Sequence, residues 1–458
     1  MEIWHVLLKV RTQENNGFQF HWKCQDLRIL NLCFADDVLI FCAGTTSSVR
    51  IIKTALTEFA ELSGLHVNPG KSTIILSKSV QRERQSILDI MGFHEGSLPI
   101  KYLGLPLTSS RLKVADCQPL IDRLNSRLAG WNHLNLSLAG RTQLIKSVLN
   151  SLHTYWASVF VLPKSIIKVI EGKMRSFLWK GSSGFGHAKV SWAQVCKTTE
   201  EGGLGIRSVL LMNQALILKQ VWRILQEDPR SIWVAWVLRH RLRHQTVWTF
   251  NVASAPWLWK KIIKICSLLK DGLVYQVGDG GKFKLWHDIW HPRGPLIRNF
   301  PRGPIITGLP SDSFLMTVMH RGQWCLPSST DFDIQQILAD LPSIGPQQID
   351  TIIWKSGQFN LKSVYAFLQP HSPRVCWHQL LGGKFKVPRH DFILWLLFWG
   401  LTTMDRLWAP NLDRSCMLCG GQDWNLIHTF SLIVHLLGAV WWCSNRGFVF
   451  LGCIGAGN

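Results

Sequence analysis

The chain has 458 residues, of which 47% are hydrophobic, so it is long enough for about three domains and apolar enough to bury a core. This composition excludes a wholly disordered chain. Lysine and arginine number 50 against 29 aspartate and glutamate, which gives a formal net charge of +21. Such an excess of positive charge predicts a polyanionic partner: nucleic acid is the first candidate and an anionic membrane surface the second.

The sequence has no marks of export or membrane insertion. Its first residues lack the apolar core and cleavage site of a signal peptide, and the longest late apolar run, 392–401, is about half a membrane span. Most of the 12 cysteines stand singly in apolar stretches, as buried thiols do in reducing compartments. We therefore expect an intracellular protein without a membrane partner. Nucleus and cytoplasm both stay open, as does the oligomeric state.

Two adjacent carboxylates, Asp36 and Asp37, interrupt the apolar stretch "NLCFADDVLIF". The short runs on either side are β-prone, so we expect the pair at a tight turn between two strands that are buried on both faces. Aspartate is also an ordinary turn residue, which is the alternative interpretation. Two carboxylates held together repel each other and need a cation, and Mg²⁺ accepts oxygen ligands and bridges to phosphates. The turn is thus a candidate magnesium site for phosphoryl transfer.

The segments after this turn alternate between helix and strand. Apolar residues of 49–64 recur at helical spacing, and Gly64 stands where a helix-ending glycine belongs. The stretch 65–76 reads as strand, Asn-Pro-Gly turn, strand, which completes half of a small α+β sandwich. Beyond about residue 107, apolar stripes predict helices, among them one over 213–227.

A cysteine pair near the C-terminus has metal-binding spacing. In "CMLCGGQDWNLIH", Cys416 and Cys419 could hold one Zn²⁺ from a tight turn, and His428 follows eight residues later. The alternative is a thiol pair in a loop.

Basic residues recur along the predicted helices. Lys260 and Lys264 share one helical face, and Lys164 and Lys168 share another. An ordinary solvated helix face explains each stripe singly, but their repetition in a strongly basic chain favours a track for nucleic-acid phosphates.

Three motifs in fixed order carry a family resemblance. "FADDVLIF" followed by a helix, "SGLHVNPGKS", and then "LPIKYLGLPL" resemble the second half of the palm of a reverse transcriptase, closest to the non-LTR (LINE-type) retrotransposons of plants. Later stretches, including "LSLAGRTQLIKSVLNSL" and "GDGGKFKLWHDIW", resemble the helical region that follows the palm in these elements. The resemblance covers nearly the whole chain and implies RNA-directed DNA synthesis with Mg²⁺.

The resemblance assigns roles to matching residues. Asp36 would be a Mg²⁺ ligand and Asp37 its neighbour in the metal site. Lys71 would lie near the phosphates of the incoming nucleotide, although a solvated turn lysine is equally consistent with its spacing. Lys101 and Tyr102 would begin the hairpin that borders the primer, with core packing as the alternative for Tyr102.

The chain departs from the family pattern at both candidate metal sites: the palm lacks an upstream aspartate, and the zinc site lacks its fourth ligand. A polymerase palm needs another aspartate on an upstream strand, and Asp26, the nearest upstream acid, lies in the approach to "FADD" instead. The stretch "FKVPRHDFILWLLFWGLTTMDRLW" resembles the approach to the zinc-binding domain at the end of these reverse transcriptases. The resemblance implies a fourth cysteine where Ile433 stands; His435 or Cys443 could substitute, but neither is at the expected spacing. We therefore expect a catalytically incomplete polymerase fragment that binds RNA or DNA, with weak or absent zinc. The alternatives are a non-catalytic nucleic-acid- or zinc-binding protein reused by its host, and a non-functional relic.

The expected fold class is α+β. The predicted segments are a partial palm (1–107), a mainly helical thumb-like region (108–253), a Trp-, Gly- and Pro-rich connector (254–370), and a degenerate zinc-binding domain with an aberrant tail (371–458).

Overall fold

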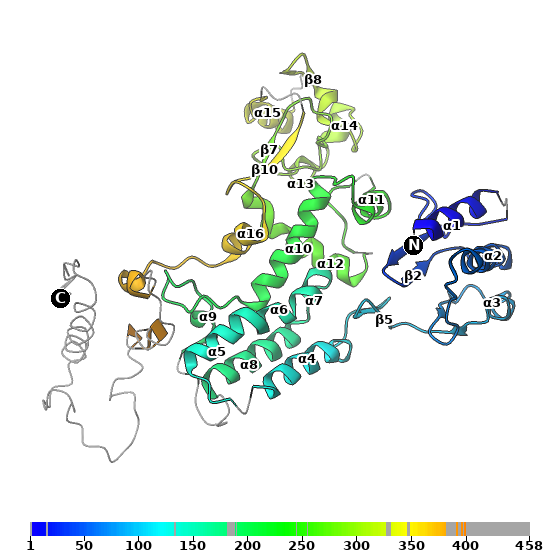
Figure 1. Cartoon of the computed structure of the whole chain (residues 1–458). Coiled ribbons are helices and arrows are strands. Elements are labelled where there is room, and N and C mark those ends of the chain that lie inside the picture. The colour runs from blue at the N-terminus through cyan, green and yellow to red at the C-terminus, as the bar shows by residue number, and fades with distance from the viewer. Residues whose placement is uncertain are drawn as a thin grey trace, which may run out of the picture. The chain divides into compact units, whose positions relative to one another are not determined.

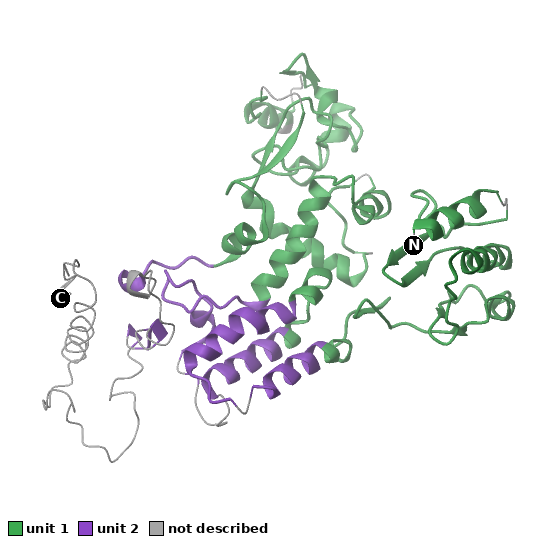
Figure 2. Cartoon of the chain, viewed as in Figure 1, with its two compact units in different colours: residues 1–119, 154–166, 210–369 green, residues 120–153, 167–209, 370–458 purple. Residues whose placement is uncertain are grey.

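The structure, a computed structural model, describes residues 2–14, 17–131, 134–180, 188, 190–243, 245–253, 255–326, 331–345 and 349–381, together with part of 391–399. The chain divides into two compact units (Figure 2). Unit 1 comprises residues 1–119, 154–166 and 210–369, and unit 2 comprises 120–153, 167–209 and 370–458. The four consecutive segments expected from the sequence stay a prediction.

The described residues form an α+β protein, as the sequence predicts (Figure 1). The first part of unit 1 contains three helices and six short strands, in the order α1 Glu2–Glu14, β1 Asn31–Phe34, β2 Asp37–Ile40, α2 Thr46–Ser63, β3 Thr73–Ile74, α3 Arg84–Met91, β4 His94–Glu95, β5 Ile100–Tyr102 and β6 Leu105–Leu107, followed by the 3₁₀ turn η1 Ala115–Cys117.

Helices α1, α2 and α3 enclose the core of this N-terminal part. Trp4 and Leu8 from α1 are buried against Ile52 and Ala55 of α2. Gly64 ends α2 in the left-handed region, with φ of 70°, so the predicted helix and its glycine cap are confirmed.

The predicted sandwich is wrong for the described residues. Among the residues that the structure describes, strands β1–β2 and β5–β6 form separate antiparallel hairpins, and β3 pairs only with β4, in parallel. Leu65 is 63% exposed, and the stretch 65–67 forms no strand. A β-prone run becomes a strand only where a neighbouring strand accepts its backbone hydrogen bonds, and this run has no such neighbour among the described residues.

The second part of unit 1 is helical with small sheets. Its elements are α7 Thr154–Val159, most of α10 Val209–Leu225, α11 Ile232–Val237, the π-helical turn η4 Leu238–Leu242, α12 Trp257–Cys266, η5 Ser267–Gly272, β7 Leu273–Gln276, α13 Leu296–Asn299, α14 Gly303–Thr307, η6 Leu315–Val318, β8 Met319–His320, β9 Gln323–Trp324, α15 Phe332–Ala339, β10 Thr351–Trp354 and α16 Leu361–Leu368. Helix α10 confirms the helix expected over 213–227. The core of this part contains several tryptophans, including Trp286, which is fully buried.

A buried carboxylate organises the glycine-rich loop 278–283 in this core. Asp350, only 2% exposed, accepts hydrogen bonds from the backbone N–H groups of Gly278 (2.7 Å), Gly280 (3.1 Å), Lys282 (2.9 Å) and Phe283 (3.2 Å). A carboxylate can accept several such bonds at once, so a single side chain satisfies four donors of one loop. The "GDGGKF" motif is therefore a structural element in this protein.

Unit 2 is helical in its described residues. It contains most of α4 Gln118–Ala129, then α5 Leu138–Leu144, the π-helical turn η2 Ile145–Leu149, α6 Asn150–Leu152, most of α8 Lys164–Lys180, α9 Trp192–Val195 and the 3₁₀ turn η7 Cys376–Leu381. Leu120 and Leu124 of α4, which lie four residues apart in one of the apolar stripes predicted beyond residue 107, are buried. No helix within the described residues is both long and apolar enough to cross a lipid bilayer.

Candidate metal and nucleic-acid site

The two candidate metal ligands lie at the tip of the β1–β2 hairpin. Phe34 pairs with Asp37, so Ala35 and Asp36 alone make the turn. The hairpin expected from the sequence is confirmed. Ala35 adopts a positive φ of 51°, a conformation that costs a residue with a side chain about 1–2 kcal/mol and that is enriched at functional sites.

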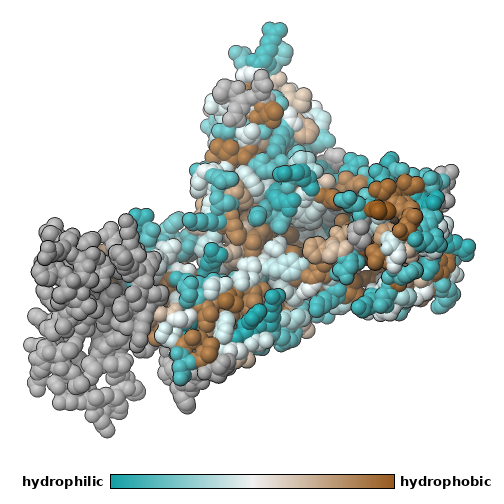
Figure 3. Space-filling view, viewed as in Figure 1, coloured by the Kyte–Doolittle hydropathy of each residue, from teal (hydrophilic) through white to brown (hydrophobic). Residues whose placement is uncertain are grey.

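The expectation that both faces of this hairpin are buried is wrong. Val38 and Ile40 pack against the N-terminal core, but Leu32 and Phe34 on the opposite face are 40% and 62% exposed. Figure 3 shows hydrophobic side chains on the surface in the region of α1 and this hairpin. Alternating residues of a strand lie on opposite faces of the sheet, and a face is buried only where another element packs on it.

Asp36 and Asp37 are both exposed, and Asp37 shares the outward face with Phe34. Two neighbouring carboxylates at an exposed turn supply oxygen donors of the kind that Mg²⁺ prefers. They fit the ion only in part, because Mg²⁺ requires octahedral coordination and no group of three or more His, Cys, Asp or Glu side chains suited to a metal occurs among the described residues.

The β5–β6 hairpin places Tyr102 near the β1–β2 hairpin, close enough for the charge of Asp37 to affect the pKa of the Tyr102 phenol. Burial raises the pKa of the Tyr102 phenol, and the charges of Asp37 and Cys33 raise this pKa further. A negative charge opposes formation of a phenolate, so the direction is the one expected for a tyrosine near a carboxylate. Lys101 is exposed on the same hairpin, where it pairs with Pro106. The placement of both residues on a hairpin is confirmed.

Tyr155 holds this second hairpin from a distant helix. Its hydroxyl donates a 2.9 Å hydrogen bond to the carbonyl of Leu103, in the turn between β5 and β6. Leu103 and Gly104 both have positive φ, as a two-residue hairpin turn requires. Sequence reasoning missed Tyr155 because 52 residues separate it from its partner and no local pattern links them.

Lys71 lies in the Asn-Pro-Gly turn, which the structure confirms. The Asn68 side chain accepts hydrogen bonds from the backbone N–H groups of Gly70 and Lys71. The Lys71 side chain is exposed, and within the described residues no hydrogen bond or ion pair joins it to Asp36 or Asp37. Its role at nucleotide phosphates stays a prediction.

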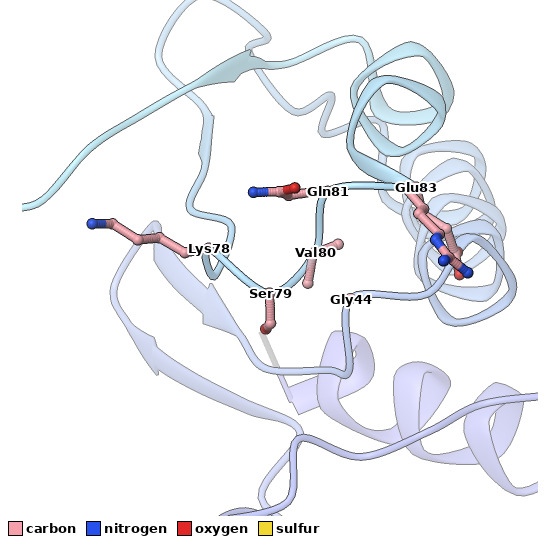
Figure 4. A pocket seen from close by; sticks show the side chains of 7 residues that line it. Gly44, Lys78, Ser79, Val80, Gln81 and Glu83 are labelled. Carbon is pink, nitrogen blue, oxygen red and sulfur yellow. The ribbon is translucent and has the colours of Figure 1, made fainter.

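A shallow pocket lies beside the N-terminus of α2, between Gly44 and the loop 78–83 (Figure 4). Lys78 and Gln81 extend to the same side of this loop. A Cβ at Gly44 would come within 2.6 Å of a Val80 methyl, so the glycine permits the close approach. The residues of the Asp36–Asp37 turn do not line this pocket.

The basic helix faces are solvent-exposed, as predicted. On α12, Lys260 and Lys264 are exposed, while Trp259, Ile262 and Cys266 of the same helix are buried. On α8, Lys164 and Lys168 are likewise exposed, four residues apart. Lys260 Nζ also donates a 2.8 Å hydrogen bond to the carbonyl of Ala253.

The predicted zinc ligands Cys416, Cys419 and His428 lie outside the described residues, as does Ile433. Their arrangement stays a prediction.

Comparisons with known proteins identify plant relatives. The chain is 36% identical to an "Uncharacterized mitochondrial protein" of Arabidopsis thaliana over 146 residues, which are 31% of this chain and 92% of that protein. The chain therefore belongs to the same family as that protein. It is also 28% identical over 352 residues, 71% of its length, to an Arabidopsis thaliana protein named "Putative ribonuclease H protein". The chain spans about half of that relative, 55% of its length. No protein-family profile matches the chain.

Proposed function

We propose that the chain is derived from the reverse transcriptase of a LINE-type retroelement, binds nucleic acid, and does not by itself polymerise. The observation that carries this proposal is the exposed Asp36–Asp37 turn, with Tyr102 of the third motif near enough for the charge of Asp37 to raise the pKa of its phenol. These are the residues that the family resemblance places around the metal and the primer. A plant relative whose name contains ribonuclease H is consistent with a nucleic-acid partner.

Binding depends mainly on charge in this proposal. The net charge of +21 and the exposed lysines of α8 and α12 favour contacts with backbone phosphates, which are independent of base sequence. Each phosphate contact releases condensed counterions, so affinity should fall steeply as salt is added.

The binding test measures dissociation constants for RNA, DNA and an RNA–DNA hybrid between low and physiological salt. The double variant Lys260→Gln/Lys264→Gln should lower the slope of log K against log salt by about 1.8 on duplex DNA, at about 0.9 per lost phosphate contact. The matched control Lys9→Gln/Lys355→Gln removes the same charge from exposed positions on α1 and after β10. A salt-independent affinity, or equal slopes for both variants, would contradict the phosphate track.

The catalytic part of the proposal has its own test. Two carboxylates alone do not fix the two metal ions that phosphoryl transfer uses, so the purified chain should not extend a primed RNA template with Mg²⁺ and labelled nucleotides. Asp36→Asn/Asp37→Asn supplies the background control. Incorporation by the unmodified chain above that background would overturn the claim of incompleteness while leaving the binding claim intact.

Cleavage of the RNA strand of a hybrid is the activity suggested by the name of one relative. We do not propose it for this chain, because the residues that the structure describes bring no group of three metal-binding side chains together. The RNA–DNA hybrid used in the binding test also tests for this cleavage. Shortened RNA after incubation of the hybrid with the chain and Mg²⁺ would show that the chain has the activity.

A further inference from the structure

A second gathering of aromatic and cationic side chains lies within unit 1, where the loop 21–28 meets α11 and η4. Trp236 Nε1 donates a 3.1 Å hydrogen bond to the carbonyl of Lys23, and Arg239 Nε donates a 3.0 Å hydrogen bond to Asp26. Each contact joins positions 213 residues apart in the sequence. We name this surface the Trp22 patch and define it by its members, Trp22, Lys23, Trp236, Arg239 and Arg241.

Cations lie over both indole rings of the Trp22 patch. Lys23 Nζ is 4.6 Å from the ring centroid of Trp22, and the guanidinium carbon of Arg241 is 5.3 Å from that of Trp236. These distances are within the range of cation–π attraction. Within the described part of the chain, neither Lys23 nor Arg241 forms an ion pair, whereas Arg239 is paired with Asp26. Two cations of the patch therefore keep their charge available to an external anion.

Trp22 is the more exposed of the two indoles in the patch, at 66% of its surface. The backbone that carries it is fixed: the N–H groups of Cys24 and Gln25 both bond to the carbonyl of His21, and the side chain of Cys24 is buried. The His21 ring stacks near the indole, with centroids 6.0 Å apart. A large apolar ring held at the surface on an ordered turn loses little conformational freedom when a ligand covers it.

We propose that the Trp22 patch binds single-stranded nucleic acid, with one base stacked on Trp22 and the neighbouring phosphates held by Lys23 and Arg241. This inference rests on the proposed function and assigns a place to one class of its ligands. An exposed indole flanked by unpaired cations matches both halves of a nucleotide, because a base offers a π-face and a phosphate offers charge. In a duplex the base faces are occupied by stacking, so the site selects single strands. A second copy of this chain fits less well, because the like charges of two such patches repel.

The test uses the full chain and short oligonucleotides of RNA and DNA, single-stranded and duplex. Trp22→Leu should weaken single-strand binding about 5-fold or more, the lower end of the range for loss of one base–aromatic stack, and leave duplex affinity unchanged. Trp22→Phe, which keeps an aromatic face, should restore most of the affinity. Lys23→Gln and Arg241→Gln should each lower the single-strand salt slope by about 0.7, and Lys355→Gln, an exposed lysine after β10, serves as the control for charge.

A direct readout separates a local role from an effect on folding. In protein labelled with 5-fluorotryptophan, the ¹⁹F resonance that is missing from Trp22→Phe belongs to Trp22, and it should shift when a single-stranded oligonucleotide is added. Unchanged single-strand affinity in Trp22→Leu, with the Trp22 signal unmoved, would refute the patch while the proposed function stands. If the unmodified chain binds no nucleic acid at all, the proposed function is refuted, and the Trp22 patch proposal is refuted with it. If Trp22→Leu instead removes only self-association, the patch is a contact between copies and the proposal is wrong.

Discussion

Replacement of Asp350 by asparagine should loosen the glycine-rich loop 278–283 far more than its small change in size suggests. The carboxylate accepts backbone hydrogen bonds from Gly278 and Gly280 through Oδ1, and from Lys282 and Phe283 through Oδ2. An asparagine keeps one acceptor oxygen and places an NH₂ group against the other two N–H donors. Asp350→Asn therefore leaves two amides of the loop without an acceptor.

The magnitude follows from the number of orphaned donors. An unsatisfied buried polar group costs about 1–3 kcal/mol, so the two N–H groups together should cost about 2–6 kcal/mol. Hydrogen exchange followed by mass spectrometry on the full chain measures this locally. Amide protection in peptides that cover 278–286 should fall by about 30-fold or more, since 2 kcal/mol corresponds to a factor of about 30.

The matched control is Asp279→Asn in the same loop. Asp279 is exposed, and its Oδ1 accepts one hydrogen bond, from the N–H of Gly281 at 3.1 Å, which an asparagine oxygen can also accept. Protection should therefore change little in this variant. If Asp350→Asn loses no more protection than Asp279→Asn, the carboxylate does not organise the loop and the structural interpretation of "GDGGKF" is refuted.

Three further predictions concern pH, packing and zinc. Burial raises the pKa of Asp288 to about 7, above its ordinary unfolded value of about 3.9. The folded state should therefore lose up to about 4 kcal/mol of stability as pH rises from about 4 through 7, and Asp288→Asn should remove this loss. A melting-temperature difference between the variant and the parent that does not grow over that pH interval would contradict this prediction. In denaturant titrations, Gly303→Ala should destabilise the protein by about 1–3 kcal/mol, because its Cβ would lie 2.4 Å from the Trp286 ring. The control Gly172→Ala, in open space on α8, should stabilise it by about 0.5–1 kcal/mol. Equal effects of the two variants would argue against close packing of Gly303 on Trp286. Ile433→Cys should raise zinc affinity against a competing chelator by completing four ligands, unless the unmodified chain already resists the chelator.

The sequence by itself determined the local features of the candidate site. The β-prone runs around Asp36 and Asp37 predicted the hairpin, the apolar spacing of 49–64 predicted α2, and Gly64 marked its end. These features depend on residues close in the sequence: turns, caps and helical periodicity are satisfied by short-range backbone and side-chain contacts. The exposed positions of Lys164 and Lys260 followed from the same periodicity.

Only the tertiary structure decided how far the hairpin is covered and which distant residues meet. The apolar side chains of Leu32 and Phe34 predicted that both would be buried in the core. Burial depends, however, on whether another element packs on their face of the hairpin, and both are exposed. The contact of Trp236 with Lys23 and the hydrogen bond from Tyr155 to Leu103 have no local signal, because each joins segments that the fold brings together over long sequence separations. Asp350 is the clearest case: a lone aspartate before a strand gains its role only when four amides of a loop some 70 residues upstream converge on it.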